Sequence, residues 1–160
     1  MEAKDYVYAL GILATFALGI WNLIQGQRSA RKASFINTVT SQRVLWLEQM
    51  RQDVAKFIGL THTWAMSELE GTDAGQEMLQ EIDRLRHVIR LRLNPKDSPD
   101  IEIASLIKKI PNLTHESQRD ELREALEALT VATQKMLKDE WDKVKRESKD
   151  GDLGETQGNA

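Results

Sequence analysis

Apolar residues are unevenly distributed along this chain, with one long uncharged run near the N-terminus and broken helical stripes after it. The run extends from Tyr6 to Ile24 and reads YVYALGILATFALGIWNLI, 19 residues without a charged side chain. A helix needs roughly 20 apolar residues to cross a hydrocarbon core of about 30 Å. Tyr6 and Trp21 stand near its two ends, where aromatic rings favour the headgroup level. The pattern predicts a transmembrane helix over residues 6–24.

The charges that flank this segment indicate whether it is cleaved as a signal peptide and how it is oriented in the membrane. A cleaved signal peptide is the main alternative, but it needs a basic n-region, whereas residues 1–5 are of mixed charge. Arg28, Arg31 and Lys32 follow the run, and only Lys4 precedes it. An excess of Lys and Arg next to a span marks its cytoplasmic end, where these side chains lie at the membrane surface. We therefore expect a single-pass protein of the cell (inner) membrane, with its N-terminus outside and its C-terminal part in the cytoplasm.

Small residues recur within the predicted span. Gly11, Thr15 and Gly19 are spaced four residues apart, which places them on one face of a helix. Such a face permits close approach of two backbones in a membrane and predicts self-association into a homo-oligomer. Small residues are also common in membrane helices that do not pair, so this second interpretation stays open.

The rest of the chain is expected to be helical. Helix-breaking residues separate four stretches: 34–70, a second helix to about residue 93, 99–110, and a long helix capped by Thr114. Asp73 is expected to cap the second of these. Four stripes at spacings of three, four or seven predict the buried positions: Ile36, Val39, Leu47, Met50, Val54, Phe57 and Trp64; Met78, Ile82, Leu85 and Ile89; Ile103, Leu106, Ile107 and Ile110; Leu122, Leu126, Leu129, Met136 and Val144.

The expected fold is therefore all-α, with one N-terminal transmembrane helix followed by an antiparallel bundle of about four helices. The corresponding division is a short flank (1–5), the transmembrane helix (6–24), a basic juxtamembrane segment (25–33), a helical cytoplasmic domain (34–147) and a disordered polar tail (148–160).

One segment of the first bundle helix is apolar on more than one face. Val44, Leu45, Trp46 and Leu47 are consecutive, so they cover most of the helix circumference. This predicts a second buried surface, which would be an interaction surface for a protein partner or another copy. A four-helix core that absorbs all four residues is the alternative. Trp141 is likewise expected to be a core or interface anchor.

Composition narrows the chemistry. The chain has no Cys, which excludes disulfides and thiolate metal sites, and its net charge of −3 argues against nucleic-acid binding. No catalytic, cofactor-binding or metal-binding motif is present, and neither an enzyme nor a small-molecule substrate is expected. Arg86 and Arg90 share a helical face and are candidates for anion or lipid-headgroup contacts. Ion pairing with nearby acids is the simpler alternative.

The stretches INTVTSQRVLWLEQMRQDVAKF (Ile36 to Phe57) and IRLRLNPKD (Ile89 to Asp97) resemble uncharacterised bacterial and prophage single-pass membrane proteins. Those proteins combine an N-terminal anchor with a helical cytoplasmic domain, so the resemblance implies a bacterial or phage setting and no catalytic residue. The pattern as a whole predicts a membrane-anchored interaction or scaffold protein. The alternative is a membrane-active effector, of the phage defence, superinfection exclusion or lysis type, whose span oligomerises and perturbs the bilayer.

Overall fold

A computed structural model describes the backbone of residues 3–150, and side chains within that range except those of 3–10, 12–14, 28–35 and 149–150. Its α-helices are α1 (Ala3–Met66), α2 (Asp73–Arg92), α3 (Ser98–Lys109) and α4 (Arg119–Asp150). Two short 3-10 helices, Ile110–Leu113 and Glu116–Gln118, lie between α3 and α4. Residues 3–150 contain no strand, so the all-α prediction is confirmed.

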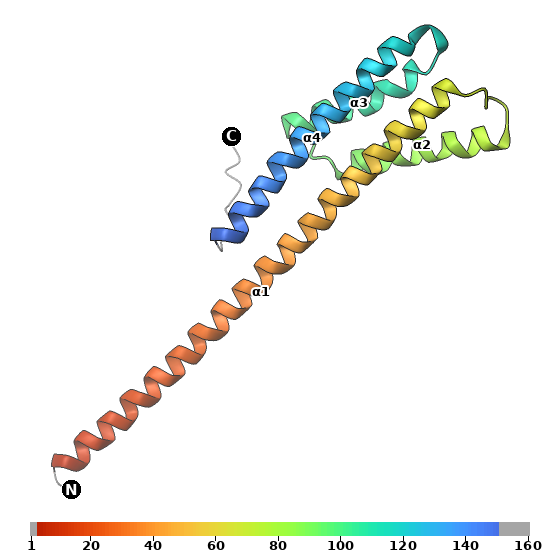
Figure 1. Ribbon diagram of the computed structural model, residues 1–160. Coiled ribbons are helices and arrows are strands. Elements are labelled where there is room, and N and C mark those ends of the chain that lie inside the picture. The colour runs from red at the N-terminus through yellow and green to blue at the C-terminus, as the bar shows by residue number, and fades with distance from the viewer. Residues whose placement is uncertain (1–2, 151–160) are drawn as a thin grey trace. The chain divides into compact units, whose positions relative to one another are not determined.

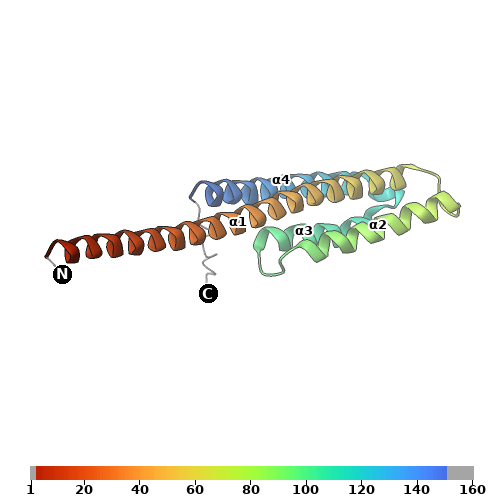
Figure 2. The same cartoon turned by 90° about the horizontal axis from the view of Figure 1, so that it is seen from below.

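The chain divides into two compact units, residues 42–146 and residues 1–41 with 147–160. The first unit is a helical bundle built from α1 after Ser41, α2, α3 and α4 up to Arg146 (Figure 1). Within this unit, α1 lies beside the antiparallel α4, and α2 lies beside α3 (Figure 2). The predicted bundle is thereby confirmed.

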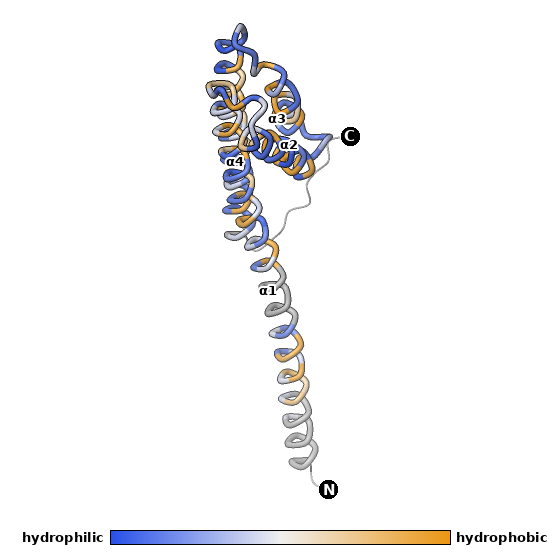
Figure 3. The backbone as a smooth tube through the Cα atoms, turned by 90° about the vertical axis from the view of Figure 1, so that its right-hand side faces the viewer, coloured by the Kyte–Doolittle hydropathy of each residue, from blue (hydrophilic) through white to orange (hydrophobic). Residues whose placement is uncertain are grey.

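The core of the bundle follows the predicted stripes. Met50, Phe57, Leu85 and Ile107 are fully buried, and apolar positions alternate with polar ones along all four helices (Figure 3). Nearly every residue expected inside is buried or half-buried, because each helix has one apolar face and the four faces meet. The core comprises chiefly Leu47, Met50, Val54 and Phe57 of α1, Ile82, Leu85 and Ile89 of α2, Ile103 and Ile107 of α3, and Leu122, Leu126, Leu129, Met136 and Val144 of α4.

The boundary between α1 and α2 differs from the sequence-based expectation. Helix α1 ends at Met66 rather than near residue 70. The cap of α2 is Thr72, not Asp73, because the Thr72 hydroxyl accepts a hydrogen bond from the Gly75 N–H at 3.0 Å. Gly71 supports this turn with a φ of +78°, a conformation that glycine adopts without strain.

The start and the end of α4 also differ from the prediction. Thr114 does not cap this helix, since its hydroxyl donates to the Pro111 carbonyl at 3.2 Å and α4 begins at Arg119. A turn of 3-10 helix is inserted between the two positions. At the other end α4 runs to Asp150, so the first residues of the expected disordered tail are helical. The rest of that tail, 151–160, lies outside the described residues.

Helix α1 continues without interruption through the predicted span and juxtamembrane segment. Over the residues that the structure describes, no helix is both long and apolar enough to cross a membrane. The predicted span falls partly outside these residues, since the side chains of 6–10 and 12–14 are not described. The same holds for Arg28, Arg31 and Lys32.

Candidate interaction groove

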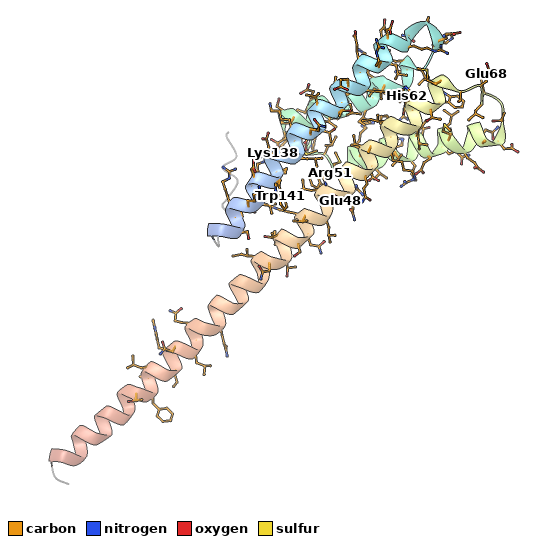
Figure 4. All side chains as sticks on the ribbon, in the orientation of Figure 1. Glu48, Arg51, His62, Glu68, Lys138 and Trp141 are labelled. Atoms are coloured by element: carbon orange, nitrogen blue, oxygen red, sulfur yellow. The ribbon has the colours of Figure 1, made fainter. Side chains whose placement is uncertain are left out.

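An apolar groove lies between α1 and α4 in the unit of residues 42–146. It has a volume of about 580 Å³. Its lining residues come from two turns of each helix: Val44, Leu45, Leu47, Glu48 and Arg51 from α1, and Gln134, Leu137, Lys138 and Trp141 from α4. Glu48 and Arg51 face Lys138 and Trp141 across it (Figure 4).

Three large apolar side chains in the groove remain open to solvent. Leu45 is 54% exposed, Trp141 39% and Val44 37%. Leu47 and Leu137, which form the floor, belong to the bundle core. This apolar surface is concave, continuous across two helices and uncovered. Such a surface marks a binding site more often than a single exposed Leu does.

Charged side chains surround this apolar floor. Arg51 donates to Glu48 at 2.5 Å, and Gln52 donates to the other carboxylate oxygen of Glu48 at 2.9 Å. On α4, Lys138 donates to Asp142 and thereby lowers the pKa of that carboxyl. All four ionic partners are well exposed, so each pair contributes little to stability and exchanges readily for another partner.

The Trp141 ring is held in place by its own helix. The ammonium of Lys145 lies 5.6 Å from the ring centroid, within the range of a cation–π contact. This contact leaves the ring partly exposed at the groove, where its large apolar area is available for binding.

The predicted interaction surface of Val44 to Leu47 is divided by the fold. Val44 and Leu45 are exposed in the groove, whereas Trp46 packs against the core and Leu47 is 5% exposed. Helical rotation separates neighbouring residues by about 100°, so one face of α1 enters the core and the adjacent face remains outside.

Sequence patterns marked Trp141 as a core or interface anchor, but they did not indicate a groove on α4. Leu137 and Trp141 stand four residues apart, beside rather than on the stripe that predicts the α4 core. This second apolar pair was the available signal. Its meaning depends on α4 lying next to α1, which no local pattern indicates.

The candidate anion residues are not gathered into a site. Arg86 pairs with Asp83 at 3.1 Å, while Arg90 is exposed on the same helix. Two neighbouring arginines are also paired, Arg84 with Glu81 and Arg92 with Asp53. The acids interleaved with this basic group therefore compensate much of its charge.

Two of the three small residues predicted to form a self-association face border a hollow on α1, and Gly11 does not. Thr15 and Gly19 contribute to it, together with Phe16, Ile20, Leu23 and Ile24. The Thr15 hydroxyl donates to the Gly11 carbonyl at 2.8 Å, so its polar group is satisfied within its own helix. A side chain added at Gly11 or Gly19 would meet nothing within 4 Å. The hollow is thus an open apolar notch at Gly19.

A third hollow, of about 670 Å³, lies between the start of α3 and the second half of α4. Asp100 is its most buried polar residue, and the carboxylate accepts a hydrogen bond from the Asn94 N–H at 2.7 Å. Burial raises the pKa of Asp100, and the nearby Asp97 and Glu140 carboxylates raise it further. Among the described residues, no three His or acidic side chains are arranged to hold a metal ion.

Neither a protein-family model, nor a curated protein, nor a solved structure matches this chain. The resemblance to bacterial and prophage membrane proteins therefore stays a prediction. The groove and the N-terminal apolar run are the two features of the chain that bear on its function.

Proposed function

We propose that this protein is a membrane-anchored helical interaction module that presents the α1–α4 groove to another protein chain. The observation that carries the proposal is the meeting of Val44 and Leu45 with Trp141 in one uncovered apolar concavity. Trp141 lies 96 positions after Leu45 in the sequence. Only burial against a partner would remove all three side chains from water. The role is binding, and it requires neither a cofactor nor a reacting group.

The anchor is the uncharged run from Tyr6 to Ile24. Phe16 is 69% exposed, and Leu18 and Trp21 are each 63% exposed. A row of such side chains is unfavourable in water and favourable in a hydrocarbon core. The basic residues after the run support a cytoplasmic bundle, an outside N-terminus and a location in a bacterial cell membrane.

The anchor is tested with two matched substitutions in the full chain. Leu18→Arg places a charge near the middle of the run, where insertion is disfavoured by about 2.5 to 3.5 kcal/mol. Leu91→Arg makes the same change on α2, at a residue that is 86% exposed. After cell lysis and an alkaline carbonate wash, wild type and Leu91→Arg should stay with the membranes, and Leu18→Arg should move toward the soluble fraction.

Wild-type protein that is washed off the membranes would overturn the anchor. Orientation is measured separately with C-terminal fusions. We expect the alkaline phosphatase fusion to be inactive and the fusion to a cytoplasmic fluorescent reporter to be fluorescent. The opposite pair of results would reverse the proposed topology.

The notch at Gly19 favours a second candidate, a membrane-active effector whose spans pack together and perturb the bilayer. The notch is apolar, and its one hydroxyl, that of Thr15, already has a hydrogen-bond partner in its own helix. Such a surface suits close packing of helices in lipid. Induction of the full chain should then admit a membrane-impermeant dye, and the double variant Gly11→Leu, Gly19→Leu should block entry. Gly26→Leu is the matched control, because Gly26 is equally open and lies outside the notch. Without dye entry for wild type, the effector candidate fails.

A further inference from the structure

We propose that the face of the bundle that carries the α1–α4 groove packs against the same face of a second copy of this chain, forming a two-fold symmetric pair. This inference rests on the proposed function and identifies its partner. It is carried by the order of charges and apolar residues along the two helices, which makes the groove complementary to itself.

The order of residues follows from the antiparallel pairing of α1 and α4. The groove uses residues 44–51 of α1 and 134–141 of α4, which run in opposite directions along it (Figure 4). Glu48 therefore lies near the level of Lys138, Arg51 near Gln134, and Val44 with Leu45 near Trp141. Each level pairs an α1 residue with an α4 residue of suitable chemistry.

A two-fold axis parallel to the helices preserves these levels. It places α1 of one copy over α4 of the other, so the Glu48 carboxylate of each copy faces the Lys138 ammonium of its partner. The same operation places each exposed Leu45 against the Trp141 ring opposite. Two acid–base contacts and two apolar contacts form at once, as an isologous interface requires.

The present charge pairs do not oppose this exchange. The Glu48–Arg51 and Lys138–Asp142 pairs are exposed ion pairs within single helices. Their loss is nearly neutral in free energy, and Arg51 and Asp142 remain at the rim, where water solvates them.

The same axis keeps the groove-lining segments of the two α1 helices parallel to each other. The groove spans only about two helical turns, so its contact area belongs to the range of weak interfaces. Tethering both copies to one membrane raises their effective concentration and compensates for weak contacts.

The test uses two differently tagged full-length chains, co-expressed in bacteria and purified from solubilised membranes through one tag. Wild-type chains should co-purify. Glu48→Lys in both chains, or Lys138→Glu in both, should lower co-purification about tenfold, because like charges then face each other twice. Glu48→Lys in one chain with Lys138→Glu in the other should restore it, since opposite charges face each other again at both contacts.

Apolar contacts are tested in the same assay. Leu45→Asp should lower co-purification by about tenfold, whereas Val131→Asp should leave it unchanged. Val131 is the matched control because it is likewise 54% exposed and lies on α4 outside the groove. Direct contact is measured by oxidation of one chain carrying R51C with another carrying Q134C, since the chain has no Cys of its own. A cross-linked heterodimer is expected, and none with L91C in place of Q134C.

Three results would each overturn the proposal. Wild-type chains could fail to co-purify, the single charge variants could pair like wild type, or the combination of Glu48→Lys with Lys138→Glu could fail to restore co-purification. The membrane fraction reports separately on the anchor. Membrane-bound chains that do not pair would refute the second copy as partner while leaving the anchor intact. Chains that cross-link only in the soluble fraction would refute the anchor and support the pair.

Discussion

Asp53 of α1 accepts a hydrogen bond from the guanidinium of Arg92, the last residue of α2, across 39 positions of sequence. The two side chains are only 21% and 24% exposed, which distinguishes this contact from the surface ion pairs of α4. It joins the end of α2 to the last quarter of α1, close to the α1 segment that lines the groove.

We expect Asp53→Asn to lower the free energy of unfolding by about 1 to 2 kcal/mol, because a half-buried guanidinium then loses its charged partner. Asp120→Asn is the control, since Asp120 pairs with Arg123 where both side chains are at least 79% exposed. That variant should change stability by less than about 0.5 kcal/mol. Chemical denaturation of both variants checks the prediction, and equal effects would contradict it.

Thr61 is fully buried on α1, and its hydroxyl has no hydrogen-bond partner within the described part of the chain. Thr61→Val removes this unsatisfied group at nearly constant volume and should raise the free energy of unfolding by about 1 kcal/mol. Thr130→Val should not, because the Thr130 hydroxyl donates to the Leu126 carbonyl at 2.9 Å. Thermal denaturation of the two variants compares them, and a lower melting temperature for Thr61→Val would refute the argument.

Two glycines should respond in opposite directions to alanine. A side chain at Gly75 would lie 2.1 Å from the Leu69 carbonyl oxygen, so Gly75→Ala forces the turn before α2 to move. We expect a loss of at least about 1 kcal/mol, by overpacking and by disturbance of the Thr72 cap. A side chain at Gly59, two turns before the end of α1, would meet nothing within 4 Å. Gly59→Ala should therefore raise the free energy of unfolding by up to about 1 kcal/mol. Urea midpoints of the two variants should shift in opposite directions.

Glu81 should make the free energy of unfolding depend on pH in the acidic range. Hydrogen bonds from Arg84 and then Lys56, the latter at 2.5 Å, lower the pKa of Glu81 from 4.5 to about 2. A lowered folded-state pKa stabilises the fold above pH 4.5, and this contribution disappears as the pH falls toward 2. The difference in unfolding free energy between wild type and Glu81→Gln should therefore be present at pH 7 and shrink on acidification. A difference that is constant from pH 7 to pH 3 would contradict this linkage.

Asp100 should act in the opposite direction. Burial raises its pKa, so the folded state takes up a proton more readily than the unfolded state, and the contribution of this group to stability falls as the pH rises above 3.8. Asp100→Asn keeps an acceptor for the Asn94 N–H and removes the buried charge. We expect this variant to be at least as stable as wild type at pH 7. At acidic pH, wild type gains stability from protonation of Asp100, and the variant should lack this gain. Denaturation curves between pH 3 and pH 7 provide the measurement.

Sequence alone determined the class of fold and most of the core. Met50, Phe57, Leu85 and Leu129 stand on stripes whose period is that of a helix, and all four are fully buried. Periodicity is a local property, and it predicts which face of each helix is apolar. Helix ends were less predictable, because Thr72 and Asp73 are both good capping residues and their competition depends on the geometry of the turn.

The tertiary structure alone decided where the unburied apolar residues meet. Leu45 stands two residues before the core residue Leu47, and Trp141 stands four residues after the core residue Leu137. Neither spacing indicates that Leu45 and Trp141 share a groove. That outcome depends on the rotation of α1 and α4 about their axes and on which helices are neighbours, since both follow from packing the whole core at once. Local pattern thus determined what each helix buries, and packing among the helices decided what the bundle leaves exposed.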